Sequence, residues 1–331
     1  MEQHQGAVRA YRLSDRPVVE ASSVPGYEPI FNAGLLVHQG VYHLFARGVR
    51  SGYRRNDADG PRFLDYVSDV LVFESEDGLA YEFKYVLAHA GLGGTYAIED
   101  PRVQRVRSNG DQHIVMTYTN LMANDGDAPW RIGMHELVYE AGRFCLVDAP
   151  PRVIGPPGVP NKDGVVFNLA DGKVALLHRV YPNIQIAVFD SIQRMAAADG
   201  RYWRHHLKDI DRHTIITPSA GALAAGAGAP PVTTDEGHVL FFHERREDGT
   251  YTMNVALLDS KTGRVRHRLD DPLLAPELTW ERVGDADNVV FVQGAHKRNG
   301  QIYLTYGAGD RCVGAAAVDV DQLLGALMAS G

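Results

Sequence analysis

The sequence predicts an all-β protein, a five-bladed β-propeller, because one block of residues recurs five times along its 331 positions. Each block holds three short apolar stretches that begin or end in polar residues. The blocks lie about 60 to 70 residues apart, which is the length of a propeller blade or a somewhat larger unit. Short runs of apolar and β-branched residues broken by Gly, Asn and Asp are typical of strands joined by hairpins. A radial array of small antiparallel sheets accounts for the spacing.

The three stretches of each block are expected to be successive strands of one blade. The first stretches, which we expect to line the central channel, are 31–36, 98–103, 161–167, 228–232 and 287–291. The second stretches are 41–47, 113–119, 173–179, 238–244 and 301–310. The third stretches, most of which end in Asp or Glu, are 69–74, 131–138, 184–190, 252–259 and 312–319.

Two segments depart from this repeat. Residues 48–69 are long, polar and rich in Arg, and they directly follow a second stretch. A loop of this length beside a pocket is often a functional lid, but a solvated excursion explains it equally well. Residues 191–204 show helical spacing of Ile192, Met195 and Ala196, which predicts a short surface helix between blades.

Composition indicates a single domain over residues 1–331, with residues 1–25 as an N-terminal extension and 320–331 as a C-terminal tail. The net charge of −8 and the scattered basic residues give no reason to expect nucleic acid. We expect no membrane partner, since no apolar run has the length of a span and no signal peptide is evident. Cytoplasm is therefore the default location, and homo-oligomerisation is left open. No metal site is expected, because no His, Cys or Asp cluster has ligand spacing.

Propeller geometry predicts the position of the functional site. Innermost strands line the channel, so polar residues at the ends of first and second stretches should converge on one axial pocket. Carboxylate, guanidinium, imidazole and amide groups in one pocket suit a polyhydroxylated or anionic ligand. The residues expected there are Asn32, Arg47, Glu99, Asp100, Arg102, Tyr118, Lys162, Asp163, His178, Arg179, His243, Glu244, Asp287 and Asp310.

Five motifs in order resemble glycoside hydrolase family 130, the β-mannoside phosphorylases and some β-1,2-mannosidases. Any one of them alone would be weak, but five at blade spacing, from about residue 31 to about residue 324, are specific. Members of this family are five-bladed propellers, in agreement with the fold predicted from the repeat. The motifs are 97–102 (AIEDPR), 161–167 (NKDGVVF), 175–179 (ALLHR) with 182–187 (PNIQIA), 226–234 (GAGAPPVTT) and 306–310 (YGAGD).

The resemblance implies inverting phosphorolysis of a β-mannoside, of manno-oligosaccharide or mannosyl-glucose type, to α-mannose 1-phosphate. It implies that Asp100 is the acid, acting through a sugar hydroxyl, and that Lys162, His178 and Arg131 hold phosphate. Inorganic phosphate would be a co-substrate, and no cofactor is expected. A phosphorylase needs only one acid, because its nucleophile is already an anion. The residues expected to bind the sugar are Asn32, Arg47, Glu99, Arg102, Asp163, Arg179, His243 and Asp310.

Other interpretations of these residues stay open. By themselves, Asp100 before a proline can cap a turn, Lys162 can be solvated, and His178 can be a core histidine. Strand alternation points Arg179 away from His178, so an ion pair between blades is an equally good interpretation of Arg179. A β-1,2-mannosidase with Glu244 as its base is an alternative, and so is a non-catalytic sugar-binding propeller. The linkage and the acceptor sugar are not determined by the sequence.

Overall fold

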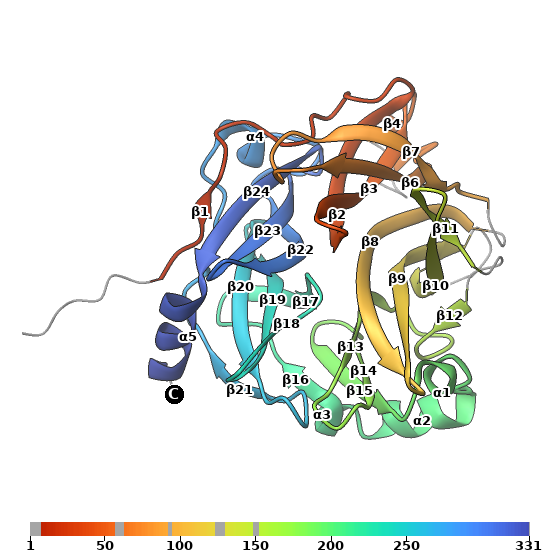
Figure 1. Cartoon of the computed structure of the whole chain (residues 1–331), viewed down its shortest axis with the longest axis vertical. Coiled ribbons are helices and arrows are strands. Elements are labelled where there is room, and N and C mark those ends of the chain that lie inside the picture. Colours follow the sequence, from red (N-terminus) through yellow and green to blue (C-terminus); the bar gives the residue numbers. More distant parts are fainter. Residues whose placement is uncertain (1–7, 57–62, 92–94, 123–129, 148–151, 331) are drawn as a thin grey trace, which may run out of the picture.

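The computed structural model describes residues 8–56, 63–91, 95–122, 130–147 and 152–330. Within these residues five antiparallel sheets of four or five strands stand around one axis (Figure 1). This arrangement confirms the predicted five-bladed β-propeller.

The two inner strands of every blade carry the residues nearest the axis. The innermost strands are β2 (Tyr27–His38), β8 (Thr95–Ser108), β13 (Lys162–Asn168), β17 (Ala222–Ala227) with β18 (Val232–Thr234), and β22 (Val290–Arg298). Their neighbours are β3 (Val41–Arg50), β9 (Asp111–Met122), β14 (Val174–Arg179), β19 (Gly237–Arg246) and β23 (Gln301–Ala308).

The two outer layers complete the blades. The third strands are β6 (Ser68–Ser75), β10 (Trp130–Glu140), β15 (Ile184–Phe189), β20 (Tyr251–Leu258) and β24 (Cys312–Asp319). The outermost strands are β7 (Glu82–Ala88), β11 (Arg143–Leu146) with β12 (Arg152–Ile154), β16 (Thr214–Ile216), β21 (Val265–Arg268) and β1 (Tyr11–Arg12).

Blade 4 differs from the strands predicted for it. The predicted stretch 228–232 lies mostly in the gap between β17 and β18, both of which pair with β19. Pro230 and Pro231 occupy this gap, and neither has an amide hydrogen to donate to a neighbouring strand. The innermost strand of blade 4 is therefore interrupted rather than continuous.

The two ends of the described chain are built into the propeller. Strand β1 pairs with β24, with Tyr11 opposite Ala317 and Arg12 opposite Ala316. Residues 320–329 form helix α5 (Val320–Ala329), whose Leu323 and Leu327 are fully buried in the core between blades 4 and 5. Parts of the predicted N-terminal extension and C-terminal tail are therefore packed against the blades.

Five apolar clusters hold neighbouring blades together, one at each junction. The cluster between blades 1 and 2, for example, joins Phe45 and Val72 to Ile98 and Met116. Full burial of an aliphatic or aromatic side chain of this size stabilises a fold by about 1.5–3 kcal/mol. The blades are thus fixed against one another by side-chain packing, which keeps the axial ends of their strands in register.

The shorter elements lie between or beside the blades. Helices α1 (Ile192–Ala196) and α2 (Gly200–Lys208) fall in and beyond the predicted helix of 191–204, and the side chains of Ser191 and Asp199 cap them. Two short helices therefore replace the one that was predicted. The remaining elements are α3 (Ile210–His213), α4 (Thr279–Arg282), β4 (Arg54–Arg55) and β5 (Phe63–Leu64). No helix in the described ranges combines the length and the apolar character needed to cross a membrane.

Bulges in three innermost strands turn polar side chains toward the axis. Asn32, Asp100 and Asp163 have φ of 47°, 53° and 56°, and each lies where the pairing register shifts in β2, β8 or β13. Asn and Asp adopt this left-handed conformation more readily than other non-glycine residues. The identity of these three residues is therefore required by the backbone as well as by the chemistry of the cavity.

Candidate active site

The bulged ends of the innermost strands surround a cavity on the propeller axis. Its volume is about 120 Å³, and its wall is mainly polar. All five blades contribute to it. The lining residues are Asn32, Arg47, Glu99, Asp100, Lys162, Asp163, Arg179, His243, Tyr251, Val289, Phe291 and Asp310.

Asp100 lies in the wall with one oxygen held by neighbours. Asn32 Nδ2 donates to Asp100 Oδ1 at 2.8 Å, and the Arg47 guanidinium approaches the same oxygen at 3.4 Å. The residue is 8% exposed. Because both contacts are made to Oδ1, Oδ2 is the oxygen that is left for a ligand in the cavity.

Glu99 stands beside Asp100 in the same wall and is paired with Arg47. Burial raises the pKa of Glu99, and the nearby Asp100 adds to this increase, while Arg47 opposes it. The guanidinium of Arg47 also lies 4.9 Å from the ring centroid of Phe31 and 5.2 Å from that of Tyr66. Arg47 is thus fixed from several sides and cannot leave the cavity wall freely.

Two cations stand directly opposite each other on neighbouring strands. Lys162 of β13 pairs in register with Arg179 of β14, and both line the cavity. Burial lowers the pKa of Lys162, and the positive charge of Arg179 lowers it further. Like charges directly across a strand pair are destabilising. This part of the wall therefore favours a negatively charged group in the cavity.

Asp163 partly compensates these cations. Its Oδ2 lies 3.1 Å from Arg179 Nε and 3.6 Å from His243 Nε2. Burial would raise the pKa of Asp163, but Arg179 and His243 outweigh it and hold the pKa well below its usual range. Gly226 makes room for this group, since a Cβ there would lie 2.3 Å from Asp163 Oδ2 and 2.4 Å from His243 Nε2.

Arg102 does not line the cavity, which corrects the expectation that it contacts substrate. Its side chain is fully buried and donates to the carbonyl oxygens of Asp100, Ala227 and Gly228 at 2.8–2.9 Å. It also reaches Asp163 Oδ1 at 3.2 Å. Arg102 therefore lies outside the cavity and holds the cavity residues in position, because its hydrogen bonds join β8 to blades 3 and 4.

His178 is also absent from the cavity, so its predicted contact with phosphate is corrected. Its ring is fully buried between Asn161, at 3.1 Å from Nδ1, and His206, at 2.9 Å from Nε2. Burial lowers the pKa of His178 well below its usual range, so the ring is neutral. Strand alternation explains the outcome: Arg179 faces the axis, and the preceding residue must face the neighbouring blade.

Four further expected residues lie outside the cavity. Asp287 accepts a hydrogen bond from the Gly284 amide at 3.2 Å and does not line the cavity. Arg131 donates to the Trp130 and Val159 carbonyl oxygens at 3.2 and 3.3 Å and does not line the cavity, so its expected place beside phosphate is corrected. Glu244 is buried against Arg268 and the Ser219 amide, at 2.6 and 2.7 Å. Tyr118 is a core residue.

Sequence reasoning missed the apolar side of the cavity. Tyr251, Val289 and Phe291 line it, and the Phe291 ring lies 4.0 Å, centroid to centroid, from the His243 ring. Val289 and Phe291 fall in a predicted first stretch, so their position was foreseeable, but only polar residues were expected to line the pocket. Tyr251 directly precedes a third stretch and gave no signal. The exposed ring of Trp130 lies with its centroid 5.5 Å from Lys162 Nζ.

The Arg-rich segment of 48–69 places an aromatic cluster beside the cavity. The Tyr66 ring stacks on Phe63, with centroids 4.9 Å apart, and meets Tyr53 edge to face. The Tyr53 hydroxyl donates to Asp285 of the connection between blades 4 and 5. The described part of this segment is therefore attached across the cavity wall, next to Arg47, and is not a free excursion. Residues 57–62 of this segment lie outside the described residues.

A metal ion has no evident place here: no group of three or more His, Cys, Asp or Glu side chains within the described ranges is arranged to hold one. The cavity instead combines a held aspartate, a second carboxylate and a cross-strand pair of cations. Fold and site together define a propeller whose axial cavity is equipped to bind a polar ligand and an anion side by side.

Comparison with known proteins agrees with this class. The chain belongs to glycoside hydrolase family 130, because the family model described as β-1,4-mannooligosaccharide phosphorylase matches residues 7–328. It is 28% identical over 332 residues to a 1,2-β-oligomannan phosphorylase of Thermoanaerobacter sp. strain X514, covering 96% of this chain and 99% of that one. A β-1,2-mannobiose phosphorylase of the same organism is 29% identical over 327 residues, with coverages of 95% and 99%.

A solved structure has the same fold. The β-1,2-mannobiose phosphorylase of Listeria innocua, in complex with β-1,2-mannobiose, superimposes with a TM-score of 0.76. It is 20% identical, and the match covers 97% of this chain and 99% of that one.

Proposed function

We propose that this protein is an inverting β-mannoside phosphorylase that converts a manno-oligosaccharide and inorganic phosphate to α-mannose 1-phosphate and a shortened acceptor sugar. The observation that carries the proposal is the half-buried cross-strand pair of Lys162 and Arg179, in a wall that also holds Asp100. Two cations side by side have a use in binding an anionic nucleophile and none in activating water. Membership of the family supports the same reaction.

In this mechanism Asp100 is the acid. Its Oδ1 is held by Asn32 and Arg47, which leaves Oδ2 for the substrate. The proton passes to the leaving glycosidic oxygen, through a sugar hydroxyl if the family mechanism applies, as the bond from that oxygen to the anomeric carbon breaks. A phosphate oxygen forms the new bond to the same carbon from the opposite face, so the β-mannoside yields α-mannose 1-phosphate. No cofactor is needed.

The phosphate is held by Lys162 and Arg179, which replaces the expected set of Lys162, His178 and Arg131. A guanidinium offers two parallel donors to a phosphate, and an ammonium adds a compact positive charge. An anion between them would relieve their mutual repulsion. Asn32, Arg47, Glu99, Asp163, His243 and Asp310 remain the proposed sugar-binding residues.

The hydrolytic alternative lacks its expected base. Glu244 is buried against Arg268 and does not line the cavity. Asp163, which does line it, is a poor base, because Arg179 and His243 hold its pKa well below the usual range. A β-1,2-mannosidase would need a carboxylate ready to accept a proton from water. Glu99 also lines the cavity and has a pKa raised by burial, but it is paired with Arg47. The phosphorylase is therefore the better supported reaction.

A β-1,2-linked manno-oligosaccharide is the first substrate to test. Both full-length curated relatives are named for β-1,2-linked substrates, whereas the family model is described by a β-1,4 activity. We propose that the aromatic cluster of Tyr53, Phe63 and Tyr66 shapes the acceptor subsite, since it lies against Arg47 at the cavity. A ring face in such a place is suited to packing against a sugar.

The decisive experiment is incubation of the wild-type protein with β-1,2- and β-1,4-mannobiose, each with and without phosphate. Formation of α-mannose 1-phosphate only in the presence of phosphate is the expected result. Release of free mannose at the same rate without phosphate would replace this proposal by the mannosidase.

A separate variant tests the acceptor subsite. Tyr66→Ala should raise the KM for acceptor sugars in the synthetic direction, while the KM for phosphate stays the same. Tyr181→Ala, at a residue that is 67% exposed, is the matched control. If Tyr66→Ala lowered only the unfolding temperature, the segment would have no part in acceptor binding.

A further inference from the structure

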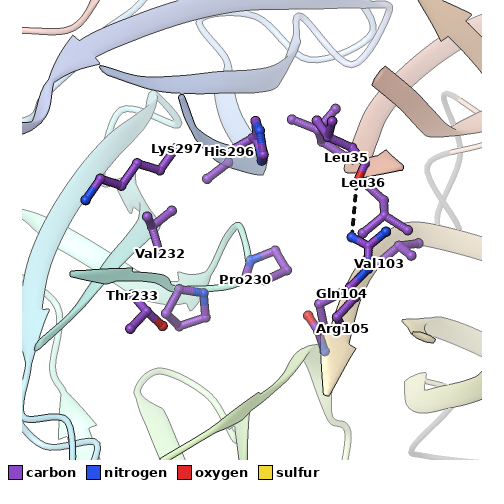
Figure 2. Close-up of a pocket in the computed structure, with 13 residues that line it drawn as sticks. Leu35, Leu36, Val103, Gln104, Arg105, Pro230, Val232, Thr233, His296 and Lys297 are labelled. Atoms are coloured by element: carbon purple, nitrogen blue, oxygen red, sulfur yellow. Dashed lines mark hydrogen bonds between the residues drawn. The ribbon is translucent and has the colours of Figure 1, made fainter. Parts of the chain in front are cut away.

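The opposite end of the propeller axis holds a second cavity, of about 320 Å³. Figure 2 shows its wall, with Gln104 and Arg105 of β8 on one side of the opening and His296 and Lys297 of β22 on the other. The strands β2, β8 and β22 line both cavities, at positions three to six residues apart. At about 3.3 Å per residue the two cavities are therefore about 10–20 Å apart along the strands.

Closely packed backbone separates the two cavities. A Cβ at Gly34 would lie 2.4 Å from the Pro101 oxygen, and one at Gly294 would lie 2.4 Å from Leu35 Cβ. Gln293 is fully buried between them and donates to the Pro101 oxygen at 3.3 Å. A ligand in the second cavity would therefore not reach Asp100 through the channel.

The charged side chains that line the second cavity, Arg105 and Lys297, are both basic. His296 lines it as well, but burial lowers its pKa, and none of the lining residues is Asp or Glu. The active-site cavity, in contrast, has carboxylates as well as cations in its wall. The same three strands thus present a mixed set of charges at one end and a positive set at the other.

Arg105 is half-buried without a carboxylate partner among the described residues. Its guanidinium donates to the Val37 oxygen at 3.0 Å and meets His38 Nδ1 at 2.7 Å. These contacts use two of its five N–H donors. Burial lowers the pKa of Arg105, and no acidic group offsets the effect. A buried cation is ordinarily paired, so the unused donors are available to an anion.

Gln104 adds an unsatisfied amide beside this cation. The residue is 7% exposed, and neither its Nε2 nor its Oε1 has a hydrogen-bond partner within the described part of the chain. Buried amides are normally paired, because leaving them unpaired is costly. Thr233 also lines the cavity, and most of the other lining residues are apolar, among them Leu35, Val103 and Pro230. The cavity thus combines cations, one free amide and an apolar surface.

We propose that this second cavity binds a small phosphate monoester of about the size of a sugar phosphate. Arg105 and Lys297 would hold the phosphoryl group, Gln104 would bond a hydroxyl or phosphoryl oxygen, and the apolar wall would cover the organic part. The volume lies at the lower end of the range of small-molecule sites. This proposal does not depend on the proposed reaction.

The test is calorimetric titration of the full-length protein with glucose 6-phosphate, in a buffer free of phosphate and sulfate. Wild-type protein and Lys162→Ala should bind it equally, because Lys162 belongs to the other cavity. Arg105→Gln should weaken binding about 10-fold to 150-fold, the ratio that corresponds to one charge-assisted hydrogen bond. Lys297→Ala should weaken it less, and Lys173→Ala, at an exposed lysine of blade 3, should leave it unchanged.

Gln104→Met keeps the proposal testable if Arg105→Gln fails to fold. Replacing an unpaired buried amide by an apolar side chain should weaken glucose 6-phosphate binding while the unfolding temperature stays equal or rises. Three results would overturn the proposal. They are binding lost in Lys162→Ala but kept in Arg105→Gln and Lys297→Ala, inorganic phosphate bound as tightly as glucose 6-phosphate, and no binding by wild-type protein at millimolar concentration.

Discussion

Blades 1 to 3 and blades 4 and 5 build different halves of the active-site cavity. The first half supplies Asp100, the proposed acid, its neighbour Asn32 and both members of the cation pair, all on or beside bulged strands. The second half supplies the apolar side chains Phe291, Val289 and Tyr251 as well as His243 and Asp310, and it leaves space at Gly226. We propose that bond breaking and phosphate binding belong to the first half, and that the second half sets the shape available to the sugar.

Of the variants that test this division, replacement of the proposed acid should have the largest effect on activity. Asp100→Asn should lower kcat about 100-fold to 10,000-fold in both directions, because the proton is lost while the side-chain volume is kept. Asn also tolerates the positive φ of this position, so folding should be unchanged. Initial rates with saturating substrates measure the effect, and Asp171→Asn, in an exposed turn, is the control. Retained turnover would assign the acid to another carboxyl group, with Glu99 as the next candidate.

Loss of one cation should affect phosphate alone. Lys162→Ala should raise the KM for phosphate about 10-fold to 150-fold and leave the KM for the mannoside nearly unchanged. Because burial lowers the pKa of Lys162, its charge is lost at a lower pH than that of an ordinary lysine. The KM of wild-type protein for phosphate should therefore rise with pH before the usual lysine range. An equal rise in Lys162→Ala would show that another group causes it.

A methyl group added at Gly226 of blade 4 tests whether the second half of the cavity sets the space available to the sugar. Gly226→Ala would push against Asp163 and His243, so we expect unfolding free energy to fall by about 1–3 kcal/mol, together with weaker mannoside binding. Chemical denaturation measures the first effect. The matched control is Gly325→Ala in α5, where a Cβ meets nothing within 4 Å and should stabilise the helix slightly.

The smallest effect is expected at the apolar wall. Phe291→Leu should raise the KM for the mannoside a few-fold, which corresponds to about 1 kcal/mol, because part of the surface against the sugar is lost. The KM for phosphate should not change. A larger effect on phosphate than on the mannoside would mean that the two halves are not functionally separate.

The repeat of apolar stretches was enough to predict the blades, because strands of this kind have a local pattern that needs no distant partner. The polar residues at strand ends then predicted most of the cavity, including Asp100, Lys162 and Asp163. His178 shows the limit of this reasoning. Strand alternation predicts that neighbouring side chains face opposite ways, but it does not predict which of them faces the axis. The bulge between Lys162 and Val165 also shifts the pairing register of the strand, so alternation cannot be extended through it.

The closure of the ring by β1 could not be predicted either, and the reason is different. Strand β1 contains only two residues, and its partner strand lies about 300 positions away, so no local pattern marks it. Arg102 was misplaced for a similar reason. It follows the acid in the AIEDPR motif, but its partners are the carbonyl oxygens of another blade, and these are not visible in any one stretch of sequence.

The pairing of β1 with β24 also determines when this molecule can be completed. A ribosome makes the chain from its N-terminus, so Tyr11 and Arg12 emerge long before Ala316 and Ala317, their partners in the last blade. Blades 1 to 4 can form while synthesis continues, but blade 5 must wait for nearly the whole chain. This pairing is a highly non-local contact, and contacts of this kind slow folding.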